Sequence, residues 1–239
     1  MSISSSDFNL KLWIIKNYDC ILNIKTINVK GYLLLGCFLN ENSYIYITFN
    51  SMTTYNELIR VFGLNGNKIK DIKNYFSFCI DTYNDKKLFK NYIITSCLGF
   101  VTSYDYTTGE IYHKYLSNDR SEHFSFIIND EEEIIKLIES SYDGNIRIWN
   151  FNTGELIKKI YICKNSLYSI CILDNNTLFI SSYDKKLRLI NLNSRIIIYS
   201  ANQNSEIISI KKIKHPLYGK SLISQGFGNE QIKIWIVNN

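Results

Sequence analysis

One short arrangement of apolar and polar residues recurs along the chain at nearly constant spacing. An apolar, a basic, an apolar and a large residue follow one another, and an Asp or Asn lies six positions before the large residue. The clearest copy contains Asp143, Gly144 and Trp149. Alternation with a period of two residues is typical of a strand with one buried face, and Asp-Gly favours a tight hairpin turn. Each copy therefore predicts a turn followed by a β-strand.

Six copies of this arrangement can be aligned, and they end at residues 13, 62, 104, 149, 190 and 235. Asp7 and Trp13, Asp143 and Trp149, and Asn229 and Trp235 give the best copies, Asp184 and Ile190 a fair one, and those ending at Phe62 and Tyr104 are weaker. Further strand-like runs separate the copies, such as residues 155–162, 167–172 and 178–182. The spacing of roughly 44 residues thus accommodates about four strands per repeat.

No stretch of the chain has a convincing period of 3.6 residues. The best helical candidate, residues 130–140 (DEEEIIKLIES), is equally compatible with an acidic turn that leads into a strand. Because every other periodic segment favours strands, the sequence predicts an all-β fold.

The stretch SSYDGNIRIWN, residues 140–150, resembles the repeat of the WD-repeat β-propellers. In that family a repeat of about 40 to 45 residues forms one four-stranded blade. The resemblance extends over nearly the whole chain, because all six copies keep the spacing. It implies a single propeller domain over residues 1–239 with about six four-stranded blades.

The histidines depart from the family pattern. Family members usually have Gly-His before the innermost strand, and the resemblance implies a buried hydrogen-bonded set of that histidine, the turn Asp, a Ser and the Trp. None of His113, His123 and His215 follows a glycine. We expect an incomplete network, with more of the stability coming from apolar packing between blades. Part of the set is expected to remain in two copies: Ser141 with Asp143, and Ser182 with Asp184.

The resemblance also predicts incomplete first and last blades. In the family the repeated motif closes the third strand of a blade, so the first blade would lack its innermost strand and the last blade its fourth. The ring could close imperfectly, be completed by a partner, or belong to a longer propeller of which this chain is a segment, the alternative that we favour. Open sheet edges invite pairing with another chain.

Composition favours a soluble intracellular protein. The apolar share is 46%, and the longest apolar run, residues 31–39, is much shorter than the roughly 20 residues that cross a bilayer. The N-terminus lacks the features of a secretory signal. We therefore expect a cytoplasmic or nuclear protein with no membrane association. The six cysteines never form C-x-x-C, and we expect them to be reduced core residues.

The formal net charge of +5 raises the question of a nucleic-acid partner. The basic residues are spread along a chain rich in Lys, Asn and Ile, whereas a nucleic-acid footprint is a concentrated patch. One basic residue lies two positions before the end of most copies, and we interpret these residues as structural, with stems that cover strand surface: Lys11, Arg60, Arg147, Arg188 and Lys233. Direct binding to RNA or chromatin is therefore the alternative, not the favoured function.

Enzyme motifs are scarce. The chain contains no G-x-S-x-G, no H-E-x-x-H and no phosphate-binding G-x-x-x-x-G-K. His113 and His123 have no neighbouring pattern of cysteines or carboxylates typical of a metal site. We expect no catalytic residues, no metal and no cofactor, although propeller enzymes can gather catalytic side chains from several blades without a sequence motif.

A tyrosine precedes the turn Asp or Asn in three copies: Tyr55, Tyr142 and Tyr183. The family geometry implies that this position lies on the narrower rim, where partner proteins dock. Tyrosine offers a large rigid surface and a hydroxyl group, which makes it a favoured interface anchor. The alternative is that Ser-Tyr-Asp is only a common form of this turn. The resemblance thus implies a non-catalytic scaffold that binds other proteins, in a multiprotein complex.

Overall fold

Every described element of the computed structural model is a β-strand, and the strands pair antiparallel, which confirms the all-β class. The structure describes residues 2–3, 9–11, 14–16, 19–21, 27–28, 32–40, 43–49, 57–63, 67–75, 77–129, 134–215, 219–226 and 233–236. Within these ranges no helix has the length and hydropathy of a membrane-spanning segment.

The chain divides into two compact units. Unit 1 comprises Met1–Cys97 and Thr102–Lys114, and unit 2 comprises Leu98–Val101 and Tyr115–Asn239. The strands β11 and β12 contain residues of both units. The prediction of a single domain over residues 1–239 stays a prediction.

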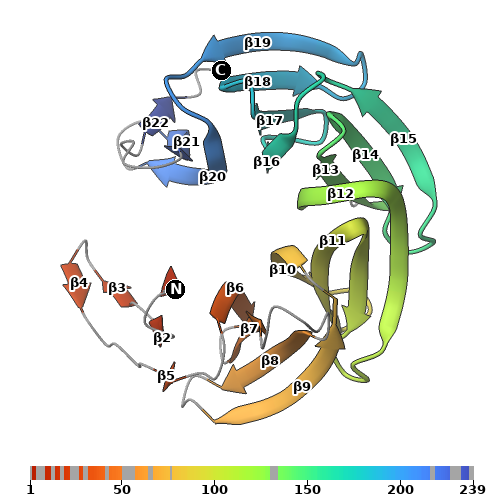
Figure 1. Cartoon of the computed structure of the whole chain (residues 1–239), viewed down its shortest axis with the longest axis vertical. Helices are drawn as coiled ribbons and strands as arrows, with labels where there is room; N and C mark the ends of the chain where they lie inside the picture. The colour runs from red at the N-terminus through yellow and green to blue at the C-terminus, as the bar shows by residue number, and fades with distance from the viewer. Residues whose placement is uncertain are drawn as a thin grey trace. The chain divides into compact units, whose positions relative to one another are not determined.

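Unit 1 contains three small or medium sheets and the beginning of a larger one. A three-stranded sheet has the order β1 (Ser2–Ile3), β2 (Asn9–Lys11) and β5 (Ile27–Asn28), and β3 (Ile14–Lys16) pairs with β4 (Asp19–Ile21). A four-stranded sheet has the order β6 (Tyr32–Asn40), β7 (Ser43–Phe49), β8 (Glu57–Gly63) and β9 (Lys68–Asn74) (Figure 1). β10 (Ser77–Asp85) pairs with the first half of β11 (Lys90–Asp105).

The long strand β11 folds back on itself. Gly99, near its middle, has φ of +82°, a left-handed conformation that glycine adopts without a steric penalty. Beyond the bend the chain returns alongside its first half, because the backbone N–H of Tyr106 donates to the carbonyl of Asn91 at 2.9 Å. Two antiparallel arms therefore lie between β10 and the start of β12. The weak copy of the repeated motif that ends at Tyr104 lies in the second arm.

Unit 2 contains two whole sheets and the second part of a six-stranded sheet, β10-β11-β12-β13-β14-β15, which begins in unit 1 (Figure 1). Its first strands, in order, are the second half of β12 (Ile111–Asn129), β13 (Ile134–Ser141), β14 (Asn145–Asn150) and β15 (Leu156–Tyr161). A four-stranded sheet follows: β16 (Leu167–Ile172), β17 (Thr177–Ser182), β18 (Lys186–Asn191) and β19 (Ile196–Asn202). The last sheet is β20 (Ile207–His215), β21 (Gly219–Gly226) and β22 (Lys233–Ile236).

The repeated motif occupies the third strand of three sheets, and in the six-stranded sheet it occupies β14, the fifth strand. It lies in β8, β14, β18 and β22, and β8, β18 and β22 are each third in the order of their sheet. The ambiguous segment 130–140 forms a strand from Ile134, so the helical alternative is wrong there. Residues 130–133, Asp7, Trp13 and Tyr55 lie outside the described residues.

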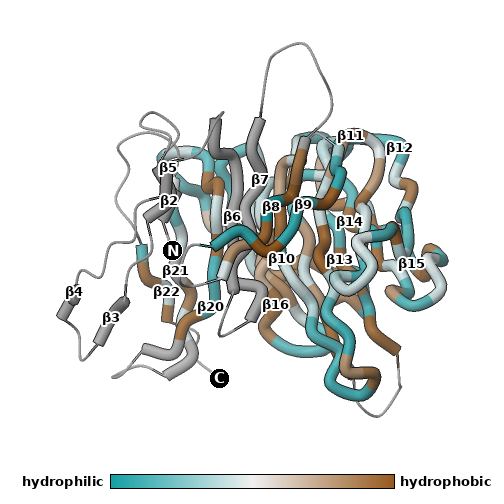
Figure 2. The backbone as a smooth tube through the Cα atoms, turned by 90° about the horizontal axis from the view of Figure 1, so that it is seen from below, coloured by the Kyte–Doolittle hydropathy of each residue, from teal (hydrophilic) through white to brown (hydrophobic). Residues whose placement is uncertain are grey.

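The core of unit 2 lies between neighbouring sheets. Ile146 of β14, Leu167 of β16, Leu178 of β17 and Ile190 of β18 are fully buried in one cluster. Burying each such side chain contributes roughly 1.5 to 3 kcal/mol. Hydrophobic and hydrophilic stretches alternate along the described strands, as Figure 2 shows. Cys79, Cys97 and Cys171 are buried and form no disulfide, as predicted for core residues, whereas Cys163 is only partly buried.

Candidate functional site

Two tight turns hold the predicted partner-binding tyrosines. In the turn between β13 and β14, Gly144 has φ of +74° and its N–H donates to the carbonyl of Ser141 at 3.2 Å. In the turn between β17 and β18, Lys185 has φ of +60° and its N–H donates to the carbonyl of Ser182 at 3.1 Å. The two turns therefore have the same backbone geometry, although only one has a glycine.

The backbone next to each tyrosine is anchored to the preceding strand segment. Tyr142 N–H donates to the carbonyl of Arg120, and Tyr183 N–H donates to the carbonyl of Ser166, both at 2.9 Å. With the main chain fixed in this way, the two side chains remain exposed, at 55% and 53% of their area. The repeats thus present both rings to solvent from equivalent positions.

Tyr142 and Tyr183 line one pocket, with a volume of about 340 Å³. Tyr168 of β16 lines it as a third ring, and its ring contacts that of Tyr183 edge to face, with centroids 6.3 Å apart. The other lining residues are Lys164, Asn165 and Ser166. Alignment of the chain's own repeats predicted Tyr142 and Tyr183 but not Tyr168. The only sign of Tyr168 in the sequence is its place in a short strand of alternating residues.

The charges around the pocket are unevenly paired. Tyr168 donates its hydroxyl to Glu206 Oε2 at 3.3 Å, and burial together with this carboxylate raises the pKa of Tyr168 to about 12. The Arg120 guanidinium lies 5.9 Å from the centroid of the Tyr142 ring and is paired with Glu122 at 2.8 Å. The ammonium group of Lys164 has no carboxylate partner among the described residues. The pocket therefore combines aromatic walls with one uncompensated positive charge.

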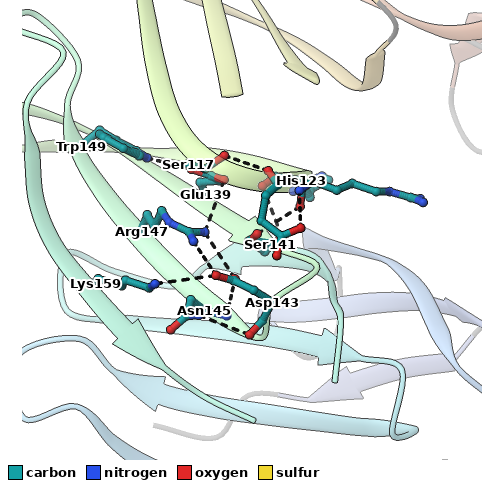
Figure 3. Close-up of polar contacts among 12 residues, drawn as sticks. Ser117, His123, Glu139, Ser141, Asp143, Asn145, Arg147, Trp149 and Lys159 are labelled. Atoms are coloured by element: carbon teal, nitrogen blue, oxygen red, sulfur yellow. Dashed lines mark hydrogen bonds and ion pairs between the residues drawn. The ribbon is translucent and has the colours of Figure 1, made fainter. Parts of the chain in front are cut away.

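A buried polar chain lies beneath the turn that carries Tyr142 (Figure 3). Trp149 Nε1 donates to Glu139 Oε2 at 2.9 Å, and Arg147 Nη1 lies 3.8 Å from Glu139 Oε1. Arg147 Nη2 also pairs with Asp143 Oδ2 at 2.5 Å. Glu139 and Arg147 are almost completely buried, so this chain holds the turn to the strands and does not face a ligand.

Burial and pairing shift the two carboxyl groups in opposite directions. Burial raises the pKa of Glu139 to about 7, against the hydrogen bond from Trp149 and the charge of Arg147. Burial also acts to raise the pKa of Asp143, but the hydrogen bonds and the charge of Arg147 outweigh it and hold that pKa below its usual range. Asp143 is therefore the ionised partner of Arg147.

The next repeat keeps the Arg–Asp pair of this hydrogen-bonded set and lacks the Trp–Glu pair. Arg188 pairs with Asp184, and Ser182 Oγ donates to the same carboxylate. In the positions of Glu139 and Trp149 this repeat has Ile180 and Ile190, both fully buried. The polar acceptor and the indole donor are thus exchanged together for an apolar pair.

A third repeat shows the same link between the tryptophan and its acceptor. Trp235 Nε1 donates to Ser224 Oγ at 2.9 Å, and Ser224 occupies the position of Glu139. The serine of the expected hydrogen-bonded set does not contact the turn aspartate. Ser141 Oγ donates to the carbonyl of Arg120, not to Asp143.

His123 lies apart from the tryptophan. It is opposite Ser140 in the pairing of β12 with β13, and Ser140 Oγ donates to its backbone carbonyl at 3.3 Å. Burial, with the charge of Lys211 adding to it, lowers the pKa of His123 to about 3, so the imidazole is neutral. Glu139, which was not predicted from the repeats, accepts the hydrogen bond from Trp149 in place of a histidine.

No metal centre is formed by the described residues, in which no group of three His, Cys, Asp or Glu side chains comes together. No protein-family model matches the chain, and no curated protein is similar to it in sequence.

Proposed function

We propose that this chain is a WD-repeat-like β-propeller, or a segment of one, that binds partner proteins and catalyses no reaction. The proposed binding surface surrounds Tyr142 and Tyr183. Support for the propeller comes from the repeat spacing and from the motif strands β8, β18 and β22, each third in an antiparallel sheet. Consecutive antiparallel sheets of about four strands are the units of that architecture.

The observation that carries the binding proposal is that tyrosines from two consecutive repeats line a single pocket. Nothing in a turn requires a large aromatic residue at the position before Asp143 or Asp184, because the turn geometry is held by backbone hydrogen bonds. Exposed aromatic rings with fixed backbones are effective anchors, since little conformational freedom is lost on binding.

The chemistry of the pocket favours a particular partner surface. Three phenol rings accept an apolar or aromatic side chain, and Lys164 favours a carboxylate beside it. A protruding loop of a partner protein that carries both groups fits these walls best.

The test is the double variant Tyr142→Ala/Tyr183→Ala. We expect its unfolding midpoint to stay near that of the wild type, because both side chains are exposed, and its affinity for a captured and purified partner to fall at least tenfold. The matched control is Tyr75→Ala/Tyr161→Ala, which removes two exposed tyrosines that do not line the pocket and should leave affinity unchanged. Equal affinity of the two double variants would refute the proposal.

A further inference from the structure

The outer strand β19 lacks the charges that protect the other outer strands. β9, β15, β19 and β22 are the last strands of their sheets. Lysines interrupt three of them: Lys68, Lys70 and Lys73 in β9, Lys158 and Lys159 in β15, and Lys233 in β22. β19, with the sequence IIIYSAN, has no charged residue. Charged side chains are a principal means by which proteins prevent edge-to-edge pairing, and β19 lacks them.

The side chains of β19 are also unusually exposed for their hydrophobicity. Ile196, Ile197, Ile198 and Tyr199 are consecutive and between 41% and 59% exposed. Successive residues of a strand point to opposite faces, so apolar groups flank β19 on both sides. The uncharged strand β16, at the other end of the same sheet, differs because most of its side chains are buried.

The outer edge of β19 is unpaired in the described part of the chain. Its inner edge pairs with β18, with Leu189 opposite Tyr199 and Ile190 opposite Ile197. No described backbone group donates to or accepts from the other edge. The N–H and C=O groups of such an edge are arranged to pair with an extended strand, not with a helix or a compact loop.

We propose that β19 pairs antiparallel with β19 of a second copy of this chain. The edge suits a strand that is uncharged and apolar on both faces, and residues 196–202 have that composition themselves. A two-fold axis perpendicular to the sheet and centred on Ile198 places the two copies of this residue opposite each other and Ile197 opposite Tyr199, because opposite residues of an antiparallel pair point to the same face. Three of the four apolar residues of each copy, Ile197, Ile198 and Tyr199, then face apolar residues of the other copy, in the self-complementary manner of two-fold dimers.

A single pair of strands buries less surface than a standard protein interface, so the dimer is weak and its population depends on concentration. It is independent of the tyrosine pocket, because none of the pocket residues belongs to β19.

Sedimentation velocity of the full chain at concentrations from about 1 to about 300 μM tests the pairing. We expect a reversible monomer–dimer equilibrium for the wild type. Ile198→Lys places a charge at the centre of the edge and should weaken dimerisation at least tenfold. The matched control is Ile157→Lys on β15, a half-exposed isoleucine beside two lysines, which should leave the equilibrium unchanged.

Amide hydrogen exchange of the same samples provides the second measurement. Amides of residues 196–200 should exchange more slowly at high concentration in the wild type and not in Ile198→Lys. A wild type that stays monomeric throughout, open-ended aggregation, or dimers that both variants keep would each overturn the proposal. The proposal would also be overturned if the amides of β19 were protected from exchange only when an unrelated apolar peptide was added.

Discussion

At the scale of single residues, each of the two described tryptophans, Trp149 and Trp235, is linked to one partner on the neighbouring strand. Trp149 donates to Glu139, and Trp235 donates to Ser224. Where the tryptophan is absent, at Ile190, the partner position is the apolar Ile180. A buried carboxylate without a donor is expensive, which explains why donor and acceptor change together.

The raised pKa of Glu139 predicts a dependence of stability on pH. A carboxyl whose pKa is 4.5 in the unfolded chain and about 7 when folded binds more protons in the folded state between these values. The contribution of Glu139 to the free energy of unfolding should therefore fall as the pH rises from about 5 to about 7, by on the order of 2 to 3 kcal/mol, and then level off. His123, whose pKa is lowered by burial from 6.5 to about 3, contributes in the opposite direction, so the contribution of Glu139 is the difference between the wild type and Glu139→Gln. Urea unfolding at a series of pH values measures this change in the free energy of unfolding.

Glu139→Gln is the control for this prediction, since the amide oxygen still accepts the hydrogen bond of Trp149 and carries no charge. The stability of the variant relative to the wild type should increase between pH 5 and pH 7, and the variant should be more stable than the wild type at pH 8. The depressed pKa of Asp143 acts in the other direction and only in more acidic solution, where its pairing with Arg147 is lost. Parallel pH profiles of variant and wild type would contradict the assignment.

At the scale of elements, the turn between β13 and β14 depends on glycine more strictly than its counterpart. A Cβ atom at Gly144 would lie 1.7 Å from the carbonyl oxygen of Cys163. The loop after β15 packs on this turn, because the N–H groups of Ile162 and Cys163 both donate to the carbonyl of Gly144. Lys185 has a similar φ in the next turn and tolerates a side chain.

We expect Gly144→Ala to lower the free energy of unfolding by at least about 2 kcal/mol, because left-handed strain and the clash with the backbone add. Lys185→Ala, at the equivalent position, exchanges one side chain for a smaller one and should change stability by less than about 0.5 kcal/mol. Chemical unfolding of both variants gives the comparison. Similar losses at the two positions would show that the clash is relieved by a shift of the loop.

At the scale of the whole molecule, the basic residues of the repeated motif do not provide a set of free positive charges, although the net charge is +5. Arg147 and Arg188 are buried and paired with Asp143 and Asp184. Lys233 donates to Gln203 Oε1 at 2.9 Å. Three of the five basic residues in the repeated motif are thus engaged within the fold, which weakens the case for a basic ring that contacts phosphates.

This arrangement predicts weak, shallowly salt-dependent binding to generic RNA. We expect the slope of log affinity against log salt to be smaller in magnitude than about 3 for a single strand, which corresponds to few phosphate contacts. Fluorescence anisotropy with an unstructured oligonucleotide at several salt concentrations measures the slope. A steeper slope with tight binding would instead favour the alternative function on RNA or chromatin.

The strands of the repeats could be predicted because their signal is local. Alternation over five or six residues with a turn before it marks β14 and β18, and the same spacing located the weak copy at Tyr104. The partners of those strands were harder to predict. Glu139 and Trp149 are ten residues apart and meet only because β13 and β14 pair antiparallel, so nothing in the order of residues marks the contact.

The sequence by itself determined the all-β class, the repeat spacing and the equivalent positions of Tyr142 and Tyr183, since all three depend on short-range periodicity and turn chemistry. Only the tertiary structure decided that the two tyrosines share a pocket with Tyr168 and Lys164, and that β19 is an outer strand with a free edge. These features arise from packing between neighbouring repeats and from the order of strands in a sheet, which a pattern of a few residues does not encode.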